Sequence, residues 1–103
     1  MPLPTRVLDI VNVRMTFRKA KVPLLEAVSF RDKSKAYAEV LAFGQVDECV
    51  ILQTCNRVEF YLVSREGEAL AKKLSEYLAN RAGAMREEAL KAIETALNHE
   101  ALA

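Results

Sequence analysis

The tetrad Thr54-Cys55-Asn56-Arg57 combines a nucleophilic thiol, two hydrogen-bonding side chains and a fixed positive charge in consecutive positions. It separates two apolar runs of strand length, which are rich in β-branched and aromatic residues, and it contains neither Gly nor Pro. In a purely structural hairpin we would expect Asn-Gly or Asp-Gly at this break, because the favoured turns require positive φ. The tetrad therefore predicts a strand end at which a thiol is presented for chemistry.

Cys55 is the candidate nucleophile of this tetrad. The reactive form is the thiolate, and a free thiol with a pKa of about 8.5 is only slightly ionised at neutral pH, so a nearby cation would help. Arg57 is two positions away, although a turn can point the two side chains to the same side or to opposite sides. A single cysteine is more often an inert small hydrophobic residue than a nucleophile. The polar neighbours of Cys55 reverse that preference.

Cys49 lies inside the first apolar run, and we predict that it is an ordinary packed residue. If both cysteines lie along one strand, their Cα atoms are about 20 Å apart at roughly 3.3 Å per residue, beyond the ~7 Å that a disulfide tolerates. Two unpaired cysteines, no signal peptide and no apolar run near the ~18 residues of a membrane span predict a reduced, soluble, cytoplasmic protein.

Composition limits the other possibilities. With 103 residues, of which 51% are hydrophobic, the chain is predicted to form one domain with a modest core. Its 15 basic and 14 acidic residues give a net charge of +1, so composition alone does not indicate a nucleic-acid partner. The glycines Gly44, Gly67 and Gly83 are too scattered for a Gly-x-Gly-x-x-Gly turn, and no metal-ligand spacing is present. We therefore expect this chain to bind neither a dinucleotide by that motif nor a metal.

Hydrophobic patterns outline the elements that must position the tetrad. Two strands flank it, one over residues 49–53 and one over residues 57–64, where apolar and polar residues alternate. Asp32 is the expected N-cap of a helix that reaches residue 43 and stops at Gly44. Three further elements are predicted from apolar runs and periodicity: a buried strand over residues 6–15, a short helical turn over 24–28 and a helix over 68–81.

Residues 16–21 form a polar and basic connection that contains Arg18, Lys19 and Lys21. Such a charge run is more often a solvated loop. The alternative interpretation is an anion-facing edge beside the tetrad, which would bind phosphate. Both hypotheses stay open on the sequence alone.

Residues 50–59, Val-Ile-Leu-Gln-Thr-Cys-Asn-Arg-Val-Glu, closely resemble the catalytic cysteine segment of glutamyl-tRNA reductase, the enzyme that starts tetrapyrrole (porphyrin) synthesis from charged tRNA. A second stretch, residues 13–22 followed by Leu25-Glu26 and Phe30, resembles the same family at the right distance upstream. The resemblance runs from about residue 7 to the end. It covers only the front part of the enzyme, because family members are several times longer.

The resemblance implies an α+β fold, namely a ferredoxin-like β-α-β-β-α-β sandwich whose antiparallel sheet carries its helices on one face. Such a fold needs a fourth strand near residues 92–97. The Ala, Glu, Leu and Lys content of residues 86–97 favours a helix instead. We expect a short helix over residues 86–90 followed by that strand, with Asn98 capping a further helix.

The resemblance also implies the chemistry. Cys55 would attack the ester carbonyl of glutamyl-tRNA and form an enzyme thioester, and NADPH would reduce the thioester to glutamate-1-semialdehyde. Arg57 would bind the glutamyl side-chain carboxylate through the two-point contact that a guanidinium allows. Thr54 and Asn56 would supply hydrogen bonds to the glutamyl group and shape the turn. No metal is implied.

The family's NADPH-binding and dimerisation domains are not expected within residues 1–103, which would be the N-terminal part of the catalytic domain. The whole enzyme would be a homodimer formed through an absent C-terminal domain, and the fragment alone would not be a competent reductase. The tRNA would be bound by a local basic patch of this chain or by parts of the enzyme outside residues 1–103.

Three residues need separate interpretation. Phe17 stands where the family usually has a histidine, so no role is carried over to it. His99 is the only histidine, but it lies outside the His-Leu-Phe-Arg context of the family, so we expect a surface residue and a general base beyond Ala103. Glu59 either pairs with Arg57 or faces solvent, and we favour the structural pairing.

Two other function classes are compatible with the same residues. A non-enzymatic α+β module would bind RNA or a protein partner through its sheet, with residues 18–21 supplying positive charge. A thiol redox protein is disfavoured by the wide separation of Cys49 and Cys55.

Overall fold

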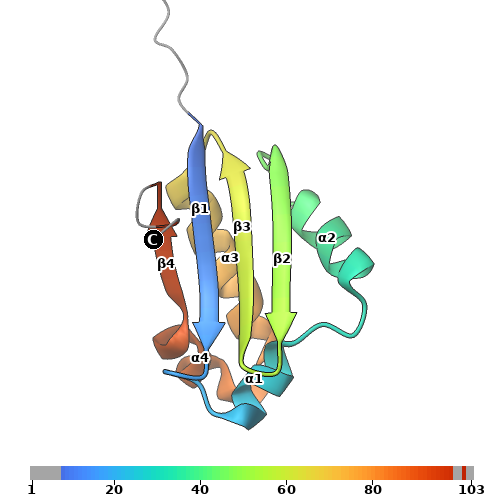
Figure 1. The fold of residues 1–103 in the computed structure, drawn as a ribbon, viewed down its shortest axis with the longest axis vertical. Helices are drawn as coiled ribbons and strands as arrows, with labels where there is room; N and C mark the ends of the chain where they lie inside the picture. Colours follow the sequence, from blue (N-terminus) through green and yellow to red (C-terminus); the bar gives the residue numbers. More distant parts are fainter. Residues whose placement is uncertain (1–7, 99–100, 102–103) are drawn as a thin grey trace, which may run out of the picture.

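The computed structural model describes residues 8–98 and 101, which form an α+β fold built on a four-stranded antiparallel sheet (Figure 1). In chain order the elements are β1 (Asp9–Thr16), α1 (Val22–Val28), α2 (Lys33–Leu41), β2 (Glu48–Thr54), β3 (Arg57–Ser64), α3 (Gly67–Arg81), a short 3₁₀ turn (Gly83–Met85), α4 (Arg86–Ala92) and β4 (Glu94–Leu97). The strand order is β2-β3-β1-β4, and each neighbouring pair is antiparallel. The predicted α+β class is confirmed.

The elements around the tetrad match their predicted ranges closely. β3 covers the predicted residues 57–64, and β2 extends the predicted strand by one residue at each end. The fourth strand is present as β4, which pairs with β1. The helix before it was predicted to end at residue 90, but α4 continues to Ala92, because Ala89 and Ala92 pack into the core. Residues 86–97 therefore hold both the helix and the strand.

α2 begins at the predicted cap and ends two residues early. The Oδ1 atom of Asp32 accepts a hydrogen bond from the N–H group of Ser34 at 2.9 Å, which confirms the N-cap. The helix ends at Leu41, and Gly44 and Gln45 follow with φ of 75° and 64°. These two left-handed residues turn the chain from α2 toward β2.

The start of α3 is capped by a residue from β1. Gly67 is the first residue of α3, and its N–H group donates to Oδ2 of Asp9 at 3.2 Å. A Cβ atom on Gly67 would lie 2.6 Å from the Cβ atom of Asp9, so only glycine allows this approach. The contact joins the first strand to the longest helix, which crosses behind the sheet in Figure 1.

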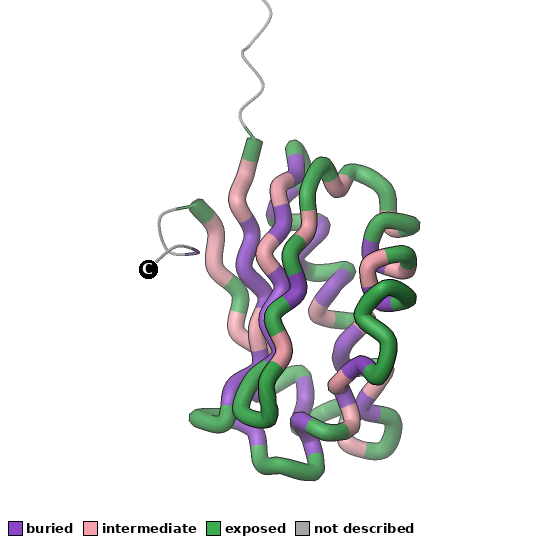
Figure 2. Tube along the Cα trace, turned by 45° about the vertical axis from the view of Figure 1, so that its right-hand side comes forward, coloured by how far each residue is buried: buried purple, intermediate pink, exposed green. Residues whose placement is uncertain are grey.

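One face of the sheet packs against the helices, which lie on the same side of it in Figures 1 and 2. Alternate residues of β1 and β3 on that face are buried: Val11, Val13, Met15, Val58, Phe60 and Leu62. Phe30 meets the ring of Phe60 edge-on at 5.8 Å, and the Arg81 guanidinium lies 3.9 Å from the centroid of the Phe30 ring. The residues between these buried positions must point to the opposite face of the sheet.

The prediction that Asn98 caps a further helix concerns residues 99–103, most of which lie outside the described residues, so it stays a prediction. The Oδ1 atom of Asn98 accepts a hydrogen bond from the N–H group of Ile10 at 3.1 Å, and the backbone N–H group of Asn98 donates to the Ile10 carbonyl at 2.7 Å. Asn98 adopts a left-handed backbone, with φ of 56°, directly after β4. The side chain is therefore used to close β4 against β1. His99 lies outside the described residues.

Candidate active site

Cys55 and Asn56 form the turn between β2 and β3, whose last paired residues are Thr54 and Arg57. Within the described part of the chain, only Gln45 and Asn98 among the non-glycine residues have positive φ. The turn is therefore made without a left-handed residue, which explains why the tetrad needs no glycine.

Two hydrogen bonds hold this turn. Oγ1 of Thr54 accepts from the N–H group of Asn56 at 3.1 Å. The carbonyl oxygen of Asn56 accepts from the N–H group of Phe17 at 2.8 Å. The second bond locks the loop after β1 beside the hairpin. The basic connection over residues 16–21 therefore lies next to the tetrad.

The two thiols have different surroundings. Cys55 is exposed on the turn, whereas Cys49 is half-buried on β2 and packs against the core. Both thiols are free. Burial raises the pKa of Cys49 to about 11, so this thiol stays protonated at neutral pH. The predicted assignment of Cys49 as a packed residue agrees with this placement.

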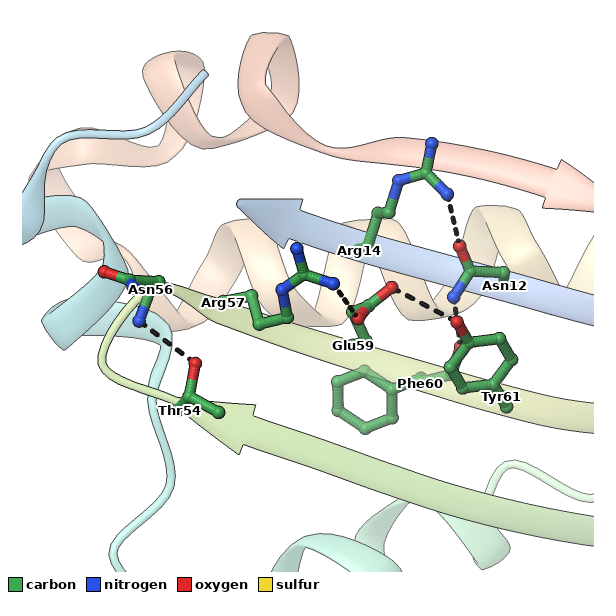
Figure 3. A network of polar contacts seen from close by, with 8 residues as sticks. All are labelled: Asn12, Arg14, Thr54, Asn56, Arg57, Glu59, Phe60 and Tyr61. Carbon is green, nitrogen blue, oxygen red and sulfur yellow. Dashed lines mark hydrogen bonds and ion pairs between the residues drawn. The ribbon is translucent and has the colours of Figure 1, made fainter. Parts of the chain in front are cut away.

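Arg57, Glu59 and Tyr61 stand together on the face of the sheet that faces away from the helices (Figure 3). Nη1 of Arg57 lies 2.9 Å from Oε2 of Glu59, whose side chain is 5% exposed. The Tyr61 hydroxyl donates to Oε1 of the same carboxylate at 3.4 Å. Burial, followed by the Glu59 charge, raises the pKa of Tyr61 and keeps this donor protonated. Glu59 is therefore a buried partner of Arg57, as predicted. The alternative interpretation, that Glu59 faces solvent, is wrong.

A second polar chain runs along β1 on the same face (Figure 3). Buried Asn12 donates through Nδ2 to the Phe60 carbonyl at 3.2 Å and accepts from Nη1 of Arg14 at 2.9 Å. Nη2 of Arg14 lies 3.7 Å from Oε2 of Glu94 on β4. Nζ of Lys19 lies 3.8 Å from the same oxygen atom. β1, β4 and the basic loop thus contribute charges to one surface.

A pocket of about 400 Å³ lies over this surface, and we call it the charged pocket. Its lining includes four cationic and two acidic side chains: Arg14, Arg18, Lys19, Arg57, Glu59 and Glu94. The excess of positive charge favours an anionic ligand. Thr16 also lines the pocket and is 6% exposed, and its Oγ1 has no hydrogen-bond partner among the described residues. A buried hydroxyl without a partner calls for an explanation, and a bound water or ion is one.

The structure brings part of the predicted site together. Arg57 lines the charged pocket, while Cys55 does not line it and stands on the adjoining turn. Thr54 and the Asn56 backbone shape the turn. The sequence interpretation did not single out Thr16 or Arg14 for the site. Their signal was the polar alternation of β1, whose register places Thr16 opposite Arg57 and Arg14 opposite Glu59.

Neither a metal-ligand cluster nor a membrane-spanning helix occurs among the described residues. Within residues 8–98 and 101, no three or more His, Cys, Asp or Glu side chains gather as metal ligands would. No helix in the described ranges has the length and apolar character needed to cross a membrane.

Comparisons with known proteins agree on one family. The sequence-family model for the glutamyl-tRNA(Glu) reductase N-terminal domain matches residues 13–103 of this chain. The glutamyl-tRNA reductase of Ignicoccus hospitalis is 35% identical over 81 residues, which are 79% of this chain and 18% of that protein. That of Carboxydothermus hydrogenoformans is 38% identical over 76 residues, covering 72% of this chain and 17% of that protein.

A solved structure gives the same result. The glutamyl-tRNA reductase of Methanopyrus kandleri superposes with a TM-score of 0.62 at 27% sequence identity, covering 90% of this chain and 20% of that one. This chain thus spans about a fifth of the length of the relatives it matches. Since the family model matches most of its residues, the chain belongs to the glutamyl-tRNA reductase family, in the region of the N-terminal domain.

Proposed function

We propose that this chain is the part of a glutamyl-tRNA reductase that takes the glutamyl group onto a cysteine. In this reaction the Cys55 thiolate attacks the carbonyl carbon of the aminoacyl ester. A carbon–sulfur bond forms, the ester carbon–oxygen bond breaks, and the terminal ribose oxygen of the tRNA leaves with a proton. The products are a thioester on Cys55 and free tRNA.

The observation that carries the proposal is an exposed thiol on a turn that adjoins a cationic pocket. Cys55 and Arg57 are separated by one residue, and the Arg57 side chain is 45% exposed. Arg57 contacts Glu59 through Nη1, which leaves its other N–H groups for a ligand. A guanidinium binds a carboxylate best through two parallel hydrogen bonds. Arg57 is therefore assigned to the glutamyl side-chain carboxylate.

The other polar groups complete a site for a glutamyl group. Glu59 and Tyr61 orient the Arg57 guanidinium from the sheet. Thr16, opposite Arg57 in the register, lines the same pocket. A glutamyl ester also carries an α-ammonium group, and the carboxylates of the charged pocket offer it a partner. Thr54 and Asn56 would add hydrogen bonds from the turn.

Reduction of the thioester is assigned to the whole protein. The sequence contains no Gly-x-Gly-x-x-Gly turn, which supports placing the dinucleotide site elsewhere in the whole protein. Conversion of the thioester to glutamate-1-semialdehyde needs the hydride of NADPH, which another part of the whole protein would bind. The tetrapyrrole pathway, the tRNA partner and a homodimer formed through a further domain belong to the same proposal.

We also infer that the fold is of the ferredoxin-like class. The strand and helix order supports this inference if α1 and α2 are taken together as the first crossover. The position of β1 and β3 in the middle of the sheet, with β4 added beside β1, supports it as well.

The proposal is tested by the loss of glutamyl-tRNA when it is mixed with this chain. The native chain should consume about one equivalent of glutamyl-tRNA in a first rapid phase, because only Cys55 is expected to accept a glutamyl group. Cys55→Ala should remove that phase, and Cys49→Ala, the matched control, should retain it. A rapid phase that survives in Cys55→Ala would refute the assignment. No rapid phase in the native chain would favour a non-enzymatic module.

A further inference from the structure

A second hollow lies beside the charged pocket and shares two residues with it. It has a volume of about 620 Å³ and is formed by the loop after β1 and the start of α1. We call it the loop groove, and its lining is Phe17, Arg18, Lys19, Ala20, Lys21, Val22 and Pro23. Arg18 and Lys19 line both hollows. A ligand in the charged pocket can therefore continue into the loop groove.

Phe17 is the unusual residue of this groove. Its side chain is 60% exposed, although a phenylalanine gains free energy from burial. A single exposed apolar residue needs no explanation by itself. Phe17 differs from such a residue because its position is fixed. Its N–H group donates to the carbonyl oxygen of Asn56 at 2.8 Å, and Asn56 is the residue that follows Cys55. The backbone that carries this aromatic ring is thus fixed beside the candidate nucleophile.

Three basic side chains line the loop groove together with Phe17. Arg18, Lys19 and Lys21 are all exposed. Lys19 pairs with Glu94, but neither Arg18 nor Lys21 makes an ion pair within the part of the chain that the structure describes. An exposed aromatic ring and cations in one groove are features with which proteins bind single-stranded nucleic acid, through base stacking and phosphate contacts.

We propose that the loop groove binds the 3′-terminal nucleotide of the tRNA, with its base stacked on Phe17 and nearby phosphates contacted by Arg18 and Lys21. This inference rests on the proposed function and names the site of the leaving group. The ester oxygen that leaves belongs to the terminal ribose, so the terminal nucleoside must lie within a few bonds of Cys55 when attack occurs. The glutamyl side chain occupies the charged pocket, which leaves the adjoining groove for the nucleoside.

Binding of uncharged tRNA tests this inference without any reaction at Cys55. Two RNAs are compared by fluorescence anisotropy, a tRNA that ends in CCA and the same tRNA without its terminal adenosine. Stacking on one aromatic side chain should make the native chain prefer the CCA end by roughly 5- to 150-fold. Phe17→Ala should abolish the preference, and Phe17→Trp should retain it. Leu41→Ala, which truncates a side chain that is 51% exposed on α2, is the matched control and should bind like the native chain.

Salt dependence gives an independent measurement. Each lost phosphate contact should reduce the slope of log K against log salt concentration by about 0.7. Arg18→Ala and Lys21→Ala should therefore each lower the slope for the CCA-ended tRNA, and Lys72→Ala on α3 should not. Circular dichroism should show native folding for all variants, because the changed side chains are exposed.

The outcomes separate the two proposals. A CCA preference that depends on Phe17 supports the groove even if Cys55 is never acylated. No CCA preference in the native chain, or an unchanged preference in Phe17→Ala, overturns it. Phe17→Ala that binds RNA normally but weakens association with another protein domain overturns it as well, and would assign Phe17 to a protein contact.

Discussion

Replacing Arg57 with lysine tests whether the charged pocket reads the glutamyl carboxylate. Lysine keeps the positive charge but offers one ammonium group instead of a planar fork. The buried Glu59 carboxylate lies 2.9 Å from Arg57 and would compete for that ammonium. The variant should therefore fold, since Glu59 keeps a cationic partner, but it should lose the two-point contact with substrate.

The magnitude follows from the exposure of Arg57. A hydrogen bond to a charged group contributes about 1.5–3 kcal/mol, and partial exposure of the Arg57 side chain, 45%, favours the lower part of this range. Loss of about 2 kcal/mol corresponds to roughly a 30-fold lower rate constant for acylation by glutamyl-tRNA at low substrate concentration.

The assay compares acylation of Cys55 by glutamyl-tRNA and glutaminyl-tRNA. The native chain should prefer glutamyl-tRNA, because glutamine has no side-chain carboxylate. Arg57→Lys should lose most of its rate with glutamyl-tRNA and little with glutaminyl-tRNA, so the preference should shrink. A lysine variant with native rate and native preference would contradict the reasoning. Arg57 would then be structural, as the partner of Glu59.

Further predictions concern reactivity and stability. A thiol-alkylating reagent at neutral pH should label exposed Cys55 well before Cys49, whose pKa is raised to about 11 by burial, and peptide mapping by mass spectrometry should show the order; equal rates would count against the distinction. Cys49→Ala should lower the free energy of unfolding by about 1 kcal/mol in urea denaturation, because the thiol packs against the core, and an unchanged midpoint would place it at the surface. Gly67→Ala should cost about 1–3 kcal/mol in the same assay, because its Cβ atom would meet Asp9 at 2.6 Å, whereas Ala69→Gly on the exposed side of α3 should cost less; reversal of this order would refute the close approach.

The hairpin could be predicted because local information determines it. A continuous apolar run defines β2, alternating apolar residues define β3, and the polar tetrad defines the break between them. The cap at Asp32 is likewise a local signal. Asn98 could not be predicted in the same way. Its side chain bonds to Ile10, a residue far away in the sequence, and only the pairing of β4 with β1 brings the two together.

The candidate site also contains residues that local sequence could predict and residues that it could not. Cys55 and Arg57 were recognisable because they are neighbours in one unusual tetrad. Thr16 and Glu94 reach the same surface only through the pairing of β1 with β3 and β4, so their role depends on sheet register. Alternation along a strand can predict that such residues share a face. Their partners on other strands can be identified only when the pairing of the strands is known.

Acid-quenched mass spectrometry of the chain after mixing with glutamyl-tRNA tests the central claim most directly. Digestion at low pH preserves a thioester and allows the modified peptide to be mapped. We predict one glutamyl group on the peptide that contains Cys55, none with uncharged tRNA, and none in Cys55→Ala. A glutamyl group on Cys49, or an unmodified Cys55 after the glutamyl-tRNA has been consumed, would contradict the account.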